Sequence, residues 1–152
     1  MKSVNYTKTF ELDVAINILF PLFSPEGEKS WVPDWDYKNI MGTSELSEDY
    51  VFLTENHDHG ATDAIWIVKR YEPDYHLVQF YKIEPEQKVG IVTVKCFAQS
   101  TSKTKTQVTY EYIALSAAGE TFIENFIESD YEKFITEWQE LLTNYFQKKD
   151  RY

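Results

Sequence analysis

The segment from Phe20 to Tyr37, FPLFSPEGEKSWVPDWDY, constrains the fold of this chain more than any other stretch. Its Pro-Glu-Gly turn and a later proline interrupt regular structure, while Trp31 and Trp35 make it too apolar for an ordinary solvated loop. A buried loop must still satisfy its backbone polar groups, so such a segment either packs on a core or lines a pocket mouth. We therefore expect a protein built around a cavity, with Trp31 and Trp35 at the cavity mouth.

Size and charge limit what the chain can bind. Its 152 residues suit one domain, and we expect residues 1–152 to fold as a single unit. Aromatic residues make up 16% of the chain, and such bulky side chains in excess either fill a core or line a pocket. The formal net charge of −10 argues against nucleic acid and anionic membrane surfaces as partners. No apolar run approaches the roughly 20 residues that span a bilayer, so we expect no stable membrane insertion.

Cysteine usage and the N-terminus predict a cytoplasmic protein. The single Cys96 cannot form an internal disulfide, which fits a reducing compartment. The opening MKSVNYTKTFELD contains no continuous apolar region of the kind that secretory signals carry. Cys96 lies in an alternating strand pattern, so we interpret it as a packed, unreactive thiol.

Hydrophobic alternation predicts a strand-rich chain. Short helical pieces follow the first strand, where Asp13 can cap a helix and Pro21 stops or splits it. The connectors EPDY, EPEQ and STSK are short and rich in turn formers, which indicates consecutive antiparallel hairpins. The seven candidate strands cover residues 3–12, 36–42, 49–55, 62–71, 75–84, 88–98 and 104–116.

The C-terminal third is predicted to be helical. Residues 120–127 form a first short helix, and Ser129 with Glu132 fits a capping box for a long helix over residues 130–147. That helix can bury its apolar stripe only by lying across the sheet, which gives an α+β protein. The stripe residues expected to be largely buried are Phe134, Trp138, Leu141 and Tyr145.

Three stretches, spread in order over most of the chain, resemble the START/polyketide-cyclase-like (helix-grip) superfamily. They are LFSPEGEKSWVPDWD, VFLTENHDHGATDAIWIVKRYEPDYHLVQFYKIEP and VTYEYIALSAAGETFIENF. The resemblance implies a curved seven-stranded antiparallel sheet wrapped around the C-terminal helix, with two short helices after the first strand and an apolar cavity between sheet and helix. Members include carriers, cyclases and hydratases, so the resemblance implies little about activity.

The polar residues that could take part in catalysis or metal binding do not form a recognisable catalytic or metal-binding motif. His57-Asp58-His59 contains metal-ligand residue types, but its neighbours Asn56 and Gly60 indicate a solvated turn, and we expect no metal. No nucleophile elbow or glycine-rich phosphate loop occurs, so we assign no catalytic residue and expect no cofactor. The acid–base candidates are His76, Asp63, Glu111 and Glu55.

Aromatic residues from the facing elements are the better candidates for a site. Tyr110 and Tyr112 share one strand face, and their hydroxyls would suit a mostly apolar ligand with one oxygenated group. If that face is the inner one, Glu111 is solvated on the other. The predicted cavity-lining residues are Trp66, Phe80, Tyr81, Phe97, Tyr110, Tyr112, Phe134 and Trp138.

Three functions are consistent with the sequence. The first is binding of a small hydrophobic molecule such as a lipid, isoprenoid or aromatic metabolite. The second is a cyclase/dehydrase-type enzyme that acts on a polyketide-like substrate by acid–base chemistry, and the third is a protein-interaction module that uses the loop from Trp31 to Trp35. Binding without catalysis is favoured because no catalytic constellation is visible. The oligomeric state, monomer or dimer, stays open.

Overall fold

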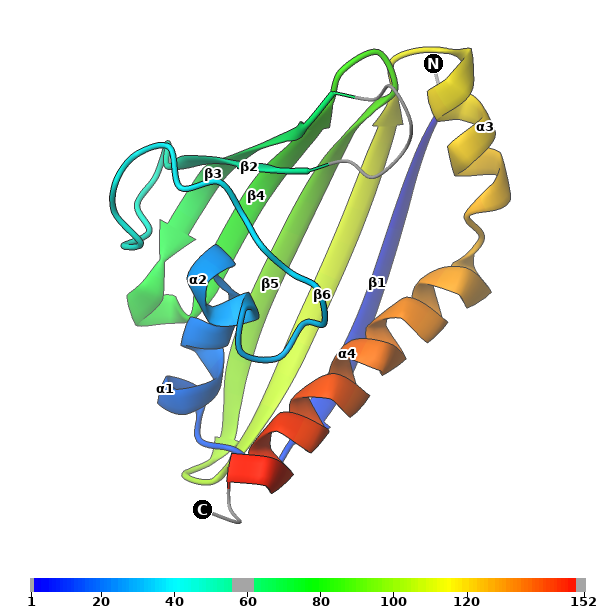
Figure 1. Cartoon of the computed structure of the whole chain (residues 1–152). Helices are drawn as coiled ribbons and strands as arrows, with labels where there is room; N and C mark the ends of the chain where they lie inside the picture. The colour runs from blue at the N-terminus through cyan, green and yellow to red at the C-terminus, as the bar shows by residue number, and fades with distance from the viewer. Residues whose placement is uncertain (1, 56–61, 150–152) are drawn as a thin grey trace.

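The computed structural model describes residues 2–55 and 62–149 (Figure 1). The first half contains β1 (Ser3–Leu12), α1 (Ile16–Leu19), the 3-10 turn η1 (Phe20–Phe23), α2 (Pro25–Glu28), β2 (Val51–Thr54) and β3 (Ala64–Glu72). The second half contains the 3-10 turn η2 (Pro73–Tyr75), β4 (Leu77–Glu84), β5 (Lys88–Ser100), β6 (Lys103–Ala114), α3 (Ala117–Asn125) and α4 (Glu128–Lys149). Within these residues, no helix combines the length and apolar character needed to cross a bilayer.

The strands form one antiparallel sheet in the order β1-β6-β5-β4-β3-β2. Figure 1 shows α4 running along β1 at one side of the sheet, with α1, η1 and α2 on the other side of the same face. Phe23 of η1 stacks on Trp138 of α4, with ring centroids 6.1 Å apart, so both groups of helices cover one face. We call this face, between the sheet and the helices, the inner face.

Side-chain alternation on β6 shows which residues point inward. Val108, Tyr110 and Tyr112 are buried, whereas Glu111 keeps partial exposure on the opposite face. The structure therefore places Tyr110 and Tyr112 on the inner face, a choice that the sequence left open. Because the period of a strand is two, the register of β6 with β5 and β1 also assigns the inner residues of those strands.

The predicted α+β helix-grip architecture is confirmed, with differences at two elements. The described residues form six strands, because the candidate at 36–42 contributes only the bridge between Lys38 and Leu53. The long helix begins at Glu128, and its capping acid is Asp130, whose Oδ2 accepts from the Ile127 N–H at 3.2 Å. The predicted capping box was therefore placed two residues too late, since acidic residues at neighbouring positions can close the same motif.

The apolar stripe of α4 is rotated from the prediction. Its fully buried residues are Tyr131, Ile135 and Leu142, while Phe134 is 36% exposed and Trp138 is half-buried. The expected burial of the stripe was thus wrong for Phe134 and only partial for Trp138, Leu141 and Tyr145. The cause is that α4 leans on the β1 side of the sheet, where the Tyr131 hydroxyl donates to the Val108 carbonyl.

Candidate functional site

Aromatic rings line the inner face from β6 to the helices. The Tyr110 ring lies 5.5 Å from Phe134 and 6.2 Å from Trp138, measured between centroids. The Tyr112 ring lies 5.2 Å from Phe122 and 5.8 Å from Phe126. These distances are within the range of favourable edge-to-face contacts, so each tyrosine is held by rings from the helical layer.

Several of these rings keep exposed surface although they contact buried residues. Phe134 is 36% exposed, yet it meets Tyr110, which is only 7% exposed. Trp66, Phe122 and Phe126 are also only partly buried. A core packed to native density would cover such large rings, so the inner face leaves apolar surface available to a further molecule.

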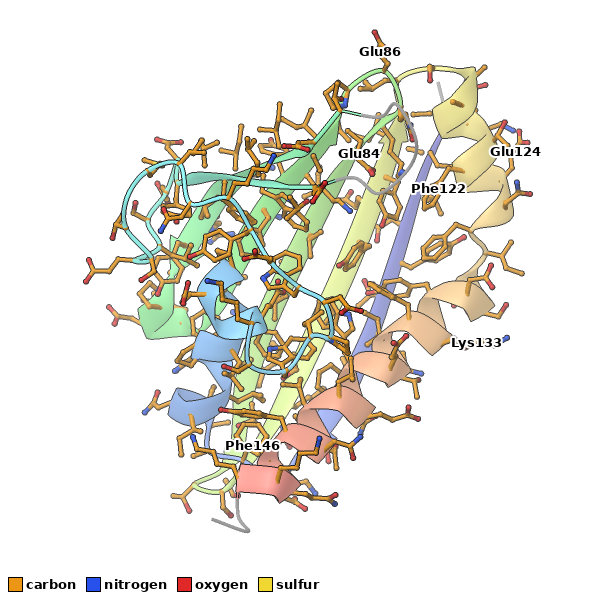
Figure 2. All side chains as sticks on the ribbon, in the orientation of Figure 1. Glu84, Glu86, Phe122, Glu124, Lys133 and Phe146 are labelled. Atoms are coloured by element: carbon orange, nitrogen blue, oxygen red, sulfur yellow. The ribbon has the colours of Figure 1, made fainter. Side chains whose placement is uncertain are left out.

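A buried ion pair lies at the end of this surface. The Lys88 Nζ is 2.7 Å from Glu84 Oε2, and the two side chains are 7% and 13% exposed. Glu84 and Lys88 face each other because they form the first pair of the β4–β5 hairpin. Lys88 also lies 3.8 Å from the Phe122 ring centroid, and Figure 2 shows Glu84 and Phe122 at the same end of the sheet. The Oε2 atom has no well-oriented hydrogen-bond donor among the described residues.

Glu28 is positioned by tight local packing. The Ser24 hydroxyl caps α2 by accepting from the Gly27 N–H at 2.9 Å. A β-carbon at Gly27 would lie 2.4 Å from the Pro21 carbonyl oxygen, so only glycine lets α2 pack this closely on η1. The resulting burial raises the pKa of Glu28 to about 8, and the positive charge of Lys82 opposes that shift only in part. Glu28 itself is only partly buried and keeps some exposed surface.

Lys82 lies on the inner face of β4, opposite Trp66 of β3 and Gly90 of β5. Its Nζ is 5.3 Å from the Trp66 ring centroid. Burial lowers the pKa of Lys82, and the charge of Lys88 lowers it further, while the charges of Glu84 and Glu28 raise it. Among the described residues no carboxylate lies within ion-pair distance of Lys82.

The two inner tyrosines supply hydroxyl groups. Within residues 2–55 and 62–149, neither the Tyr110 nor the Tyr112 hydroxyl has a hydrogen-bond partner. Burial raises the pKa of both, with smaller contributions from the charge of Glu28 at Tyr110 and of Glu84 at Tyr112. Both hydroxyls are therefore protonated at neutral pH and can donate to a ligand oxygen.

Most of the predicted lining residues lie on the inner face, but Tyr81 and Phe97 do not. Tyr81 follows the buried Phe80 on β4 and packs with Lys69, whose Nζ is 5.0 Å from its ring centroid. Phe97 is 37% exposed beside Lys95, on the face opposite the buried Cys96. Placing both residues in the cavity was wrong, since neighbouring strand residues point to opposite faces.

Trp31 and Trp35, in the loop that follows α2, pack over the inner face. Trp31 is 5% exposed, lies between Phe23 and Trp138, and donates its indole N–H to the Leu22 carbonyl at 2.8 Å. Trp35 is partly exposed, donates to the Pro25 carbonyl at 2.8 Å and packs on Trp66. Their role as the cavity mouth stays a prediction.

Among the predicted acid–base candidates, His76 lies against the helical layer, with its ring centroid 5.6 Å from that of Phe20. His76 caps η2 in the left-handed conformation, with Nε2 3.0 Å from Asn17 Oδ1. Asp63 pairs with Lys38, and Glu55 is exposed. The segment His57-Asp58-His59, which was expected to be a solvated turn, lies outside the described residues. Burial raises the pKa of the Cys96 thiol to about 11, which disfavours the reactive thiolate.

Sequence reasoning missed Glu28, Lys82, Glu84 and Lys88. The signal for Lys82 and Glu84 was present, since both continue the alternation that starts at Val78 and Phe80 on β4. Charged residue types obscured it, because they are almost never buried without a partner. For Glu28, the only signal in the sequence was its position inside an apolar loop.

A crevice of about 330 Å³ lies between η1 and the segment around Leu46, at the Val78 end of the inner face. It is lined by Phe20, Pro21, Phe23, Ser24, Ser44, Glu45, Leu46, Tyr71 and Val78. It shares no residue with the charged set on the inner face, and its one carboxylate belongs to Glu45. The part of the inner face that carries Glu28, Lys82 and the two tyrosines brings more polar groups together and is therefore the better candidate site.

Comparison with known proteins identifies the fold. No model of a protein family matches this chain, and no curated protein sequence matches it. Solved structures do: major latex-like protein 151 from Panax ginseng has a TM-score of 0.69 at 12% identity, over 93% of this chain and 96% of that one. The Zhui aromatase/cyclase from Streptomyces sp. R1128 has a TM-score of 0.61 at 10% identity, covering 95% and 91%.

A third similar structure is norcoclaurine synthase from Thalictrum flavum in complex with dopamine and hydroxybenzaldehyde. Its TM-score is 0.58 at 10% identity, and the match covers 90% of this chain and 83% of that one. At such identities the likeness shows the fold alone. It confirms the sequence-based prediction of a helix-grip fold.

Proposed function

We propose that this chain, which has the helix-grip fold of the START/polyketide-cyclase-like superfamily, binds a small, largely apolar molecule on its inner face. The observation that carries the proposal is the partly exposed ring of Phe134 against the buried Tyr110. That pairing leaves apolar surface next to a hydroxyl group that has no partner among the described residues. A ligand in contact with both would bury the ring and accept a hydrogen bond.

The surrounding groups indicate the kind of ligand. Trp66, Phe122 and Phe126 offer flat, partly exposed rings, which favour a planar or aromatic molecule. Tyr110 and Tyr112 donate hydrogen bonds, so the ligand should carry one or two acceptor oxygens. The superfamily includes both carriers and cyclases, which supports binding at the level of the fold only.

Replacement of Tyr112 by phenylalanine tests this proposal. The substitution removes a hydroxyl and little volume, so affinity for an oxygen-bearing aromatic ligand should fall about tenfold, or ~1–1.5 kcal/mol. A matched control is Tyr81→Phe, because Tyr81 lies on the opposite sheet face. The ligand is found by native mass spectrometry of the protein purified from its host, and affinity is measured by tryptophan fluorescence. Equal affinities for both variants, or no bound small molecule under any condition, would contradict the proposal.

Acid–base catalysis is a second candidate function, and Glu28 is the observation that favours it. A carboxyl whose pKa is raised to about 8 by burial can donate and accept a proton near neutral pH. The charge of Glu28 also raises the pKa of both Tyr110 and Lys82, although it is not the main cause of either shift. Turnover of a bound substrate that is lost in Glu28→Gln, while binding persists, would establish this function.

The structure does not favour a protein-interaction role for the loop from Trp31 to Trp35. The indole N–H groups of Trp31 and Trp35 already donate to backbone carbonyls within the same loop. Trp31 is also buried against Trp138, so it is not free to fill a partner's pocket.

A further inference from the structure

We propose that the Lys82 amine is a nucleophile that forms a reversible imine with an aldehyde or ketone group of a ligand on the inner face. The inference rests on the proposed function, because it needs a ligand there, and adds a covalent step. It also narrows the ligand class to carbonyl compounds that carry an aromatic or apolar body.

The geometry around Lys82 exposes its amine to the inner face. Gly90 stands opposite Lys82 on β5, and a β-carbon there would lie 3.3 Å from the Tyr112 ring and 3.6 Å from the Lys82 Cβ. The missing side chain therefore leaves room for the Lys82 stem and the Tyr112 ring to pack side by side. On the other side, Trp66 supports the amine from 5.3 Å. A ligand against Tyr112 and Trp66 would present its functional group to Nζ.

Lys88 has an ion-pair partner, whereas Lys82 has none among the described residues. Lys88 is paired with Glu84, whose Oε2 lies 2.7 Å from the Lys88 Nζ. Within the described residues, Lys82 has no carboxylate at ion-pair distance, so nothing comparable stabilises its proton. A buried lysine without a partner loses its proton readily, which is the condition for Schiff-base chemistry.

The charged groups that face Lys82 come from three elements. They are Glu28 of α2, Glu84 of β4 and Lys88 of β5. The charge of Glu84 is already compensated by Lys88. Glu28 holds a proton at neutral pH, because burial raises its pKa to about 8, so it withholds the negative charge that would keep Lys82 protonated. Burial lowers the pKa of Lys82, in agreement with this arrangement.

The covalent step is balanced without an oxidant or reductant. The Nζ lone pair attacks the carbonyl carbon, a C–N bond forms, and the C=O π electrons move to oxygen. A proton passes from nitrogen to that oxygen through the Glu28 carboxyl, which gives a carbinolamine. Glu28 then protonates the hydroxyl, water leaves, and the remaining N–H proton returns to the Glu28 carboxylate. The products are the imine and one water molecule.

Reductive trapping tests the proposal. The whole protein is incubated at pH 7 with 2-naphthaldehyde and cyanoborohydride, which reduces an imine to a stable secondary amine. Peptide mapping should place the adduct on Lys82 at a rate at least tenfold above that of Lys69, which packs on the outer face. Lys82→Met should abolish the fast labelling, whereas the matched control Lys69→Met should leave it unchanged. Labelling spread over the surface lysines, or unchanged in Lys82→Met, would overturn the proposal.

A non-reactive analogue separates this proposal from the proposed function. Binding of 2-methylnaphthalene is measured by fluorescence for wild type and for Lys82→Arg, which keeps a cation but lacks a nucleophile. Binding by both proteins together with a Lys82 adduct in wild type supports both proposals. Binding without a Lys82 adduct overturns the imine and leaves ligand binding intact. Absence of both binding and adduct overturns both.

Discussion

The pH dependence of the free energy of unfolding tests how burial affects the Glu28 carboxyl. Burial raises the pKa of its carboxyl from an ordinary value of 4.5 to about 8 in the folded protein. Between these two pH values the folded chain holds a proton that the unfolded chain releases. The contribution of this group to stability is therefore fully present below pH 4.5 and is lost as pH rises through about 8.

The size of the effect follows from the two pKa values. Their difference, about 8 minus 4.5, corresponds to about 5 kcal/mol at ~1.36 kcal/mol per pH unit. Glu28 keeps some exposed surface, where solvent screens its charge, so we take about 2 kcal/mol as the lower bound of the expected difference. Replacing Glu28 by glutamine removes the ionisable group but keeps its shape. At pH 9 the Glu28→Gln variant should be more stable than wild type by at least about 2 kcal/mol, which raises Tm by at least roughly 4–8 °C.

Urea denaturation at pH 5, 7 and 9 measures this difference. Wild type and Glu28→Gln should be nearly equal in stability at pH 5 and diverge steadily toward pH 9. The control is Glu137→Gln, because Glu137 is exposed on α4 and its replacement should give no pH-dependent difference. A difference in stability that stays constant from pH 5 to 9 would refute the reasoning. So would an NMR titration of the Glu28 side-chain carboxyl with a midpoint near 4.5.

Three further predictions concern the packing of Gly27, the hydrogen bond of Tyr131 and the segment that contains His57 and His59. Gly27→Ala should cost about 1–3 kcal/mol in urea denaturation, because its β-carbon would meet the Pro21 carbonyl; an unchanged midpoint would contradict the tight contact of α2 with η1. Tyr131→Phe should cost about 1 kcal/mol by the same assay, since the hydroxyl is buried and donates to a β6 carbonyl; no loss would show that the bond adds nothing. Replacing His57 and His59 together by alanine should change Tm by no more than about a degree or two, with or without chelator. Stoichiometric zinc that disappears in the variant would contradict the prediction that this segment binds no metal.

The fold was predictable from sequence because its signals are local. Alternation along β6 and the three- and four-residue spacing in the last helix each appear within a dozen residues. The rotation of α4 was not predictable, because a broad apolar stripe does not say which of its edges meets the sheet. Phe134 and Tyr131 both belong to that stripe, and only the hydrogen bond from Tyr131 to β6 decides between them.

The candidate site was less predictable for a related reason. Tyr110 and Tyr112 could be paired from parity alone, whereas choosing both Phe80 and Tyr81 contradicted the same parity. Lys82 follows from strict alternation once Phe80 is taken as inward. Glu28 depends on how α2 packs on η1 through Gly27, which is a tertiary contact without a sequence pattern.

The charge balance of the inner face links the two functional proposals. The chain carries a net charge of −10, yet Glu84 and Lys88 neutralise each other at 2.7 Å on this face. The remaining two groups, Glu28 and Lys82, both shift toward their uncharged forms on burial. A charged ligand would have to be desolvated without a ready counter-ion, which is costly in a largely apolar site. An uncharged aromatic molecule avoids that cost, and a carbonyl group on it can accept a hydrogen bond from Tyr112 and lie near the Lys82 amine.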